Sequence, residues 1–123
     1  MTSDPEQPWI GVDFDHTLAV YEGTLYEAGP PVPAMVERVK QWHAEGKRIK
    51  IVTARVALGA TGRDGFGGNP SFVAEQMKLI RWWCLKHLGF ELEITCQKDF
   101  KMYLLYDDCA RQVERDTGRI IGE

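Results

Sequence analysis

The stretch WIGVDFDHTLAV, residues 9–20, begins with mostly apolar residues and runs directly into two aspartates, Asp13 and Asp15. A short apolar run of this kind is typical of a parallel strand that is buried on both faces. Carboxylates placed together repel each other, and each pair about 4 Å apart costs roughly 4 kcal/mol at an effective dielectric constant of about 20. The stretch therefore predicts a buried strand that ends at a site in need of a cation.

Beyond this stretch, segments with helical and strand-like patterns alternate along the chain. One helix is expected from Pro33 to Gly46, and a second from Asn69 or Ser71 to Gly89. The further segments that predict strands are KRIKIVTA (47–54), which ends near Thr53, ELEITC (91–96), MYLLY (102–106), and RQVERDTGRII (111–121), read as two short edge strands around a turn.

This order predicts a single α/β domain over residues 9–123, preceded by a flexible tail over residues 1–8. The expected fold is a three-layer Rossmann-like domain with a mainly parallel sheet. Ligands of such sheets bind at the carboxyl ends of the strands. Three places in the sequence follow predicted strands, so their side chains should face one crevice: Asp13 with Asp15, Thr53, and Asp107 with Asp108.

The composition limits the classes of protein that fit this chain. A formal net charge of -3 gives no basic excess, so nucleic-acid binding is not indicated, although a phosphorylated substrate remains compatible. No apolar run approaches the ~20 residues that span a bilayer, so no membrane partner is expected. The 3 cysteines form no C-x-x-C pair, which favours reduced, mostly buried thiols and a cytoplasmic location.

Taken together, four motifs in this order resemble those of the haloacid dehalogenase-like (HAD) phosphohydrolase superfamily. They span residues 9–108, most of the chain. The matches are Asp13-Phe14-Asp15-His16-Thr17 for Asp-x-Asp-x-Thr, Thr53 in IVTAR for the strand that ends in Thr or Ser, Lys98 for the basic residue, and Asp107-Asp108 for the paired acids.

The resemblance implies a phosphatase that hydrolyses a phosphate monoester through an aspartyl-phosphate on Asp13. Asp15 would protonate the leaving oxygen and then activate the attacking water. Lys98 is the preferred phosphate-binding lysine, and Lys101 is its rival. The residues expected to contact the substrate are His16, Thr53, Arg55 and Lys98, and the catalytic set is Asp13, Asp15, Thr53 and Lys98.

The resemblance also implies Mg²⁺ as the cofactor, since oxygen ligands shared with a phosphate suit that ion. Its ligands would be Asp13, the backbone carbonyl of Asp15, and Asp108. Asp107 would orient its neighbour or a metal-bound water.

Two departures from the larger HAD enzymes carry expectations of their own. Only loops fit between the motifs, including a glycine-rich loop over residues 56–71, so we expect a small member without a cap domain. Cys109 stands where small relatives often carry an arginine. The motif order argues against a receiver domain, whose adjacent acids come first.

Other possibilities stay open at this stage. One is a non-catalytic HAD-fold regulatory protein that binds a phosphorylated ligand. Another is phosphoryl transfer to an acceptor other than water. Of Trp82 and Trp83, one should be buried and the other exposed, the latter as a possible contact in a homo-oligomer.

Overall fold

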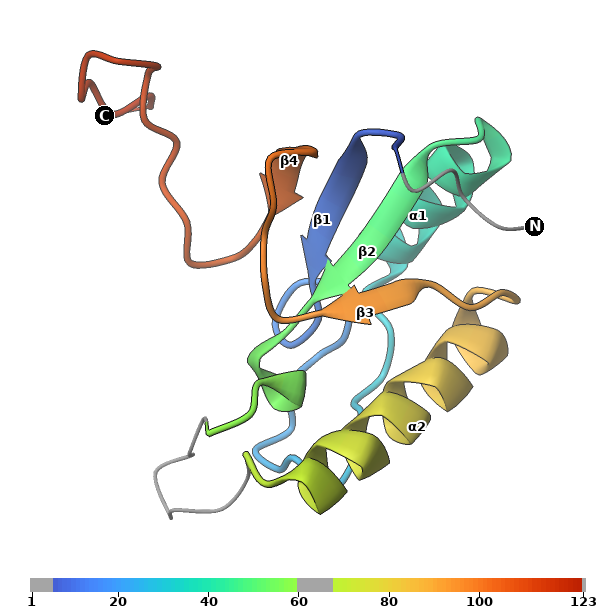
Figure 1. Ribbon diagram of the computed structural model, residues 1–123. Coiled ribbons are helices and arrows are strands. Elements are labelled where there is room, and N and C mark those ends of the chain that lie inside the picture. Colours follow the sequence, from blue (N-terminus) through green and yellow to red (C-terminus); the bar gives the residue numbers. More distant parts are fainter. Residues whose placement is uncertain (1–5, 60–67, 123) are drawn as a thin grey trace.

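The computed structural model describes residues 6–59 and 68–122 (Figure 1). All described strands belong to one parallel sheet in the order β3-β2-β1-β4. The elements in chain order are β1 (Trp9–Asp13), α1 (Pro33–Ala44), β2 (Arg48–Val52), the 3₁₀ turn η1 (Ala54–Val56), α2 (Pro70–His87), β3 (Glu93–Thr95) and β4 (Met102–Tyr106). The prediction of a Rossmann-like α/β fold with a parallel sheet is confirmed, and the described residues contain no cap domain.

One face of the sheet carries both helices. Side chains of a strand alternate between its faces, and in β1 Ile10 and Val12 point to the helical side. There they join Val39 of α1 and Ile80 of α2 in a single buried cluster. This shared cluster fixes the helices against the centre of the sheet.

The opposite face is crossed by the connection between β3 and β4, residues 96–101. The indole of Trp9 on this face is fully buried, and its Nε1 donates a hydrogen bond of 2.8 Å to Asp99 Oδ1. Lys50 Nζ lies 4.4 Å from the centroid of the Trp9 ring and 3.8 Å from Asp99 Oδ2. A loop, rather than a helix, therefore forms the third layer here.

The ends of both helices follow from their sequences. Pro33 occupies the first turn of α1, and Gly46, with a φ of 77°, follows its end. The side chain of Asn69 accepts a hydrogen bond of 2.8 Å from the backbone N–H of Phe72, so Asn69 rather than Ser71 caps α2.

The tryptophan pair on α2 divides as predicted. Trp83 is 2% exposed, contacts the ring of Phe14 edge-on at 5.1 Å, and donates a hydrogen bond of 2.8 Å to the carbonyl of Gly29. Trp82 is 61% exposed. Trp83 therefore ties α2 to the loop between β1 and α1.

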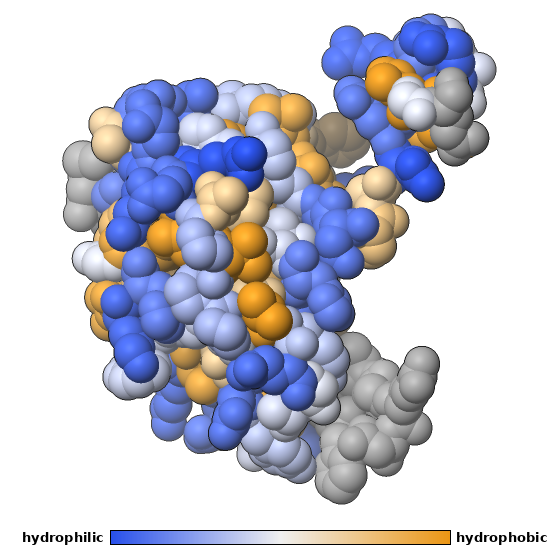
Figure 2. All heavy atoms as spheres, turned by 180° about the vertical axis from the view of Figure 1, so that it is seen from behind, coloured by the Kyte–Doolittle hydropathy of each residue, from blue (hydrophilic) through white to orange (hydrophobic). Residues whose placement is uncertain are grey.

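The prediction of two edge strands over residues 111–121 is wrong. Residues 109–122, which we call the arm, form a turn with one isolated bridge between Val113 and Ile120 and do not join the sheet. The backbone hydrogen bonds of this turn are local, for example from Glu114 N to Arg119 O at 2.7 Å. The arm projects beyond β4 and stands apart from the body (Figures 1 and 2). The turn of the arm is therefore held by contacts between residues that are close in sequence.

The structure also bears on the predictions for the cysteines, the tail, the glycine-rich loop and membrane spans, in part because some of these residues lie outside the described ranges. Cys84 is buried, but Cys96 and Cys109 are exposed, so the thiols are free without being mostly buried. In the predicted tail, Gln7 donates to the carbonyl of Gly46, while residues 1–5 lie outside the described range. Residues 60–67 of the glycine-rich loop also lie outside it. No helix within the described ranges is long and apolar enough to cross a membrane.

Candidate functional site

The first and last strands of the chain bring two acids together at the carboxyl edge of the sheet. β1 and β4 are parallel neighbours, so Asp13 at the end of β1 lies beside the chain that leaves β4. Thr17 Oγ1 is 3.3 Å from Asp13 Oδ2 and 3.4 Å from Asp108 Oδ1. The early and late acids of the sequence therefore meet around one hydroxyl.

A tight turn after β1 places that hydroxyl. The carbonyl of Phe14 accepts hydrogen bonds from the backbone N–H groups of Leu18 and Ala19, at 3.0 and 2.9 Å. Phe14 and Leu18 are both fully buried, which anchors the two ends of the turn in the core. His16 at its tip has a φ of 70° and is exposed, and its ring contacts Tyr21. The turn leaves Thr17 beside Asp13.

Burial and neighbouring acids change the protonation of Asp13. Burial, as the largest cause, together with the hydrogen bond to Asp108 and the charges of Asp107 and Asp108, raises the pKa of Asp13 to about 7. The same hydrogen bond lowers the pKa of Asp108. The two carboxyl groups therefore share a proton at mildly acid pH, because two adjacent anions are unfavourable there.

This group of oxygens fits a divalent cation. A cation between Asp13 and Asp108 would replace the shared proton and remove the repulsion that raises the pKa of Asp13. The Asp107 and Asp108 carboxylates and the Cys109 thiol also lie within 4.8 Å of one another. Cys109 Sγ donates to Asp107, which raises the thiol pKa, so sulfur stays protonated and the oxygen donors favour Mg²⁺ over a softer metal.

Asp15 is held by a different partner. Both of its carboxylate oxygens accept hydrogen bonds of 2.7 Å from Arg55, through Nε and Nη2. The Arg55 side chain is 2% exposed and that of Asp15 is 20% exposed. This bidentate pair joins Asp15 to η1, which contains Arg55.

The remaining N–H groups of Arg55 are also used. Its Nη1 donates to Gln76 Oε1 at 3.0 Å and to the carbonyl of Leu25 at 3.2 Å. Its Nη2 donates to the carbonyls of Thr24 and Glu27, at 3.4 and 3.1 Å. Arg55, predicted to contact substrate, therefore connects Asp15 to the loop before α1 and to α2.

Thr53 lies where the sequence predicts, directly after β2. Its backbone N–H donates to the carbonyl of Thr95 at 2.8 Å, and its Oγ1 accepts from the backbone N–H of Arg55 at 3.2 Å. A hydroxyl that accepts one bond can still donate another. Thr53 thus caps η1, and its hydroxyl hydrogen can donate a further bond.

The two candidate lysines occupy different places. Lys101 pairs with Glu6 at 3.0 Å, and its carbonyl accepts from the backbone N–H of Trp9, at the amino end of β1 and so opposite to Asp13. Lys98 is exposed in the connection between β3 and β4, and no hydrogen bond or ion pair joins it to another part of the described chain. Lys98 therefore makes no contact with the acids of the site in this structure, and its ammonium group is available to bind a ligand.

Sequence reasoning did not single out Thr17 and Gln76 as residues of the site. Gln76 is 3% exposed and sits among the apolar residues of α2 that face the core, including Ile80. A polar residue on such an apolar stripe is the signal that could have found it, because a buried amide needs partners. Arg55 and the carbonyl of Leu25 are those partners.

Comparison with known proteins supports the fold and goes no further. No family model matches the chain, and no curated protein matches it. A solved structure of a conserved protein from Bacteroides thetaiotaomicron is similar, with a TM-score of 0.53 and 20% sequence identity, over 85% of this chain and 78% of that chain. Similarity at this identity shows a shared fold alone.

Proposed function

We propose that the protein is a Mg²⁺-dependent phosphatase that hydrolyses a phosphate monoester, as a small cytoplasmic member of the HAD superfamily. The observation that carries this proposal is the meeting of Asp13 and Asp108 at the Thr17 hydroxyl. A carboxylate nucleophile beside a second acid matches the chemistry of an aspartyl-phosphate enzyme. Thr53 at the neighbouring strand end supports the same chemistry.

In the first step, an Asp13 oxygen attacks phosphorus and the bond to the leaving oxygen breaks. The leaving oxygen takes a proton from Asp15, and an aspartyl-phosphate remains on Asp13. Asp13 and Asp108 would hold Mg²⁺, which supplies positive charge to the phosphoryl oxygens when it is bound. The Thr53 hydroxyl and the Lys98 ammonium bind those oxygens from the protein side.

In the second step, water attacks the phosphorus of the aspartyl-phosphate, which releases phosphate and restores the Asp13 carboxylate. Asp15 accepts the proton of that water. Each Asp15 oxygen has a second lone pair, so it can accept this proton while Arg55 stays bound. The ion pair with Arg55 is therefore compatible with the role of Asp15 as the base of the second step.

The ion pair between Asp15 and Arg55 also favours a second candidate function. The first step requires Asp15 to donate a proton to the leaving oxygen, whereas both of its oxygens accept hydrogen bonds from Arg55 in the structure. A regulatory protein that binds a phosphorylated ligand without turnover needs no such donation.

Phosphate release from an aryl phosphate tests the first function. We expect release that requires Mg²⁺ and is abolished by Asp13→Asn, while Asp116→Asn in the arm leaves it unchanged. Beryllium fluoride with Mg²⁺ separates the candidates, since a trapped mimic of aspartyl-phosphate on Asp13 supports chemistry. Absence of both trapping and release across a panel of phosphomonoesters would contradict the phosphatase.

A further inference from the structure

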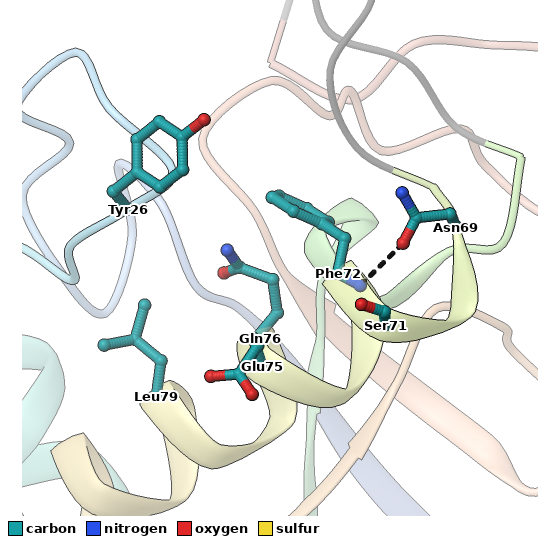
Figure 3. A pocket seen from close by; sticks show the side chains of 7 residues that line it. All are labelled: Tyr26, Asn69, Ser71, Phe72, Glu75, Gln76 and Leu79. Atoms are coloured by element: carbon teal, nitrogen blue, oxygen red, sulfur yellow. Dashed lines mark hydrogen bonds between the residues drawn. The ribbon is translucent and has the colours of Figure 1, made fainter.

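A pocket of about 430 Å³ lies between the loop before α1 and the first turns of α2 (Figure 3). This volume falls within the range of roughly 300–1,000 Å³ that is usual for small-molecule sites. Tyr26 lines it from the loop, and Phe72 and Leu79 line it from the helix. Two aromatic rings and an aliphatic side chain on facing elements form an apolar space that is open to solvent.

The floor of the pocket is joined to the candidate catalytic site. Gln76 lines the pocket, is 3% exposed, and accepts a hydrogen bond of 3.0 Å from Arg55 Nη1. The same guanidinium binds both oxygens of Asp15 at 2.7 Å. A single guanidinium group therefore separates the pocket residue Gln76 from Asp15.

Arg55 and Gln76 also hold the two walls of the pocket. The carbonyl of Leu25, next to Tyr26, accepts hydrogen bonds from Arg55 Nη1 at 3.2 Å and from Gln76 Nε2 at 2.6 Å. On the other wall, Phe72 lies one helical turn before Gln76, and the Asn69 cap fixes its backbone (Figure 3). The residues that position Asp15 thus position the pocket as well.

The lining selects a class of ligand. Aromatic side chains such as Tyr26 and Phe72 bind planar rings by stacking, which is worth roughly 1–3 kcal/mol per nucleic-acid base. Among the described residues of the lining, Glu75 is the charged one, and no lysine or arginine is present. An uncharged planar ring suits this lining, whereas a second phosphate does not.

We propose that this pocket binds the planar ring of a ring-bearing phosphate monoester, such as a nucleoside monophosphate, while the phosphoryl group lies at Asp13. The inference rests on the proposed function, in which Asp15 faces the leaving oxygen, so the organic part of the ester extends from the Asp15 side. Gln76, which lines the pocket, is connected to Asp15 through Arg55.

A matched pair of substrates tests the inference. Adenosine monophosphate and ribose phosphate are both esterified at the primary hydroxyl and differ at C1 of the sugar, which carries the base in the first and a hydroxyl in the second. For the wild type we expect kcat/KM to be about tenfold or more higher with the nucleotide, as one stacked base would give. Tyr26→Ala and Phe72→Ala should reduce that ratio to near unity. Trp82→Ala, an exposed aromatic of α2 outside the pocket, is the control that keeps the ratio.

Binding gives a second measurement that does not depend on turnover. In an Asp13→Asn background, calorimetry with the same two ligands should show tighter binding of the nucleotide by about tenfold, and Tyr26→Ala should remove the difference. Equal affinity for both ligands in this background would overturn the inference. Equal kcat/KM with active wild type would also overturn it and would leave the phosphatase standing, whereas preferential binding without any hydrolysis would count against the phosphatase alone.

Discussion

Asp13 and Asp108 lie on either side of the Thr17 hydroxyl, at 3.3 and 3.4 Å. Asp13 ends β1 and Asp108 follows β4, and the sheet order places these two strands next to each other. A connection over residues 96–101 carries the chain back across the sheet to make this possible. The site therefore depends on topology, because the acids that form it are distant in sequence.

The protonation of Asp13 gives a prediction about stability. Folding raises the pKa of Asp13 from 3.8 to about 7, mainly through burial. The folded protein thus holds a proton that the unfolded chain has released, so metal-free protein should lose stability as the pH rises from about 4 to about 7. The lowered pKa of Asp108 acts at the acid end, where it costs stability as the pH falls through that value.

Thermal unfolding with and without Mg²⁺ measures this effect. Mg²⁺ should raise Tm more at about pH 8, where both acids are charged, than at about pH 5, where a proton competes for them. Asp13→Asn should weaken both the pH trend and the response to Mg²⁺. An equal response to Mg²⁺ at both pH values would contradict the shared-proton interpretation.

The buried pair of Arg55 and Asp15 gives a second prediction. Arg55→Ala leaves a carboxylate without its partner and frees the amide of Gln76, so the free energy of unfolding should fall by about 3–5 kcal/mol. Arg55→Lys keeps the charge but not the two-pronged geometry and should recover part of this loss. Denaturant titration measures both changes. Arg119→Ala, which breaks the exposed pair with Glu114, is the control and should cost about 1 kcal/mol or less.

Much of the fold was predictable because its signals are local. The apolar run into Asp13 and the glycines after each helix act within a few residues and are where the sequence predicts them, and the cap at Asn69 is one of the two that it offered. The crevice at the carboxyl edge followed from a general rule for parallel sheets. Local pattern plus that rule was enough to bring Asp13 towards Asp108.

The partners of Arg55 were not predictable in the same way. A guanidinium binds whichever oxygens the fold presents, and here these come from Asp15, a loop over residues 24–27, and Gln76. The prediction for the arm was wrong because the turn at Asp116-Thr117-Gly118 suggested two edge strands, whereas no strand of the described sheet pairs with residues 111–121. Both cases depend on contacts between distant segments, which a local pattern does not contain.

The placement of the two lysines gives a third prediction. Lys101 lies with Glu6 at the amino end of β1, away from Asp13, so we expect Lys98 to be the lysine that contacts the phosphoryl group. Lys98→Ala should lower kcat/KM for phosphate release by about 10²-fold, a typical cost of removing one electrostatic contact to the reacting group. Lys101→Ala should leave kcat/KM within about threefold of wild type, since an exposed pair contributes little. Steady-state kinetics of both variants measures these changes. A larger loss of kcat/KM in Lys101→Ala than in Lys98→Ala would show that Lys101 is the phosphate-binding lysine.

The arm gives the last prediction. The hydrogen bonds of residues 111–122 and the ion pair between Glu114 and Arg119 stay within this segment, and Figure 2 shows the arm separate from the body. Deletion of residues 111–122 should therefore change the Tm of the remaining domain little and leave the Mg²⁺ response at Asp13 intact, because no core contact is lost. Thermal unfolding of both proteins tests this at low concentration, while light scattering follows their mass. A large drop in Tm accompanied by a change from dimer to monomer would instead show that the arm, with exposed Val113 and Ile121, is buried between two copies of the chain.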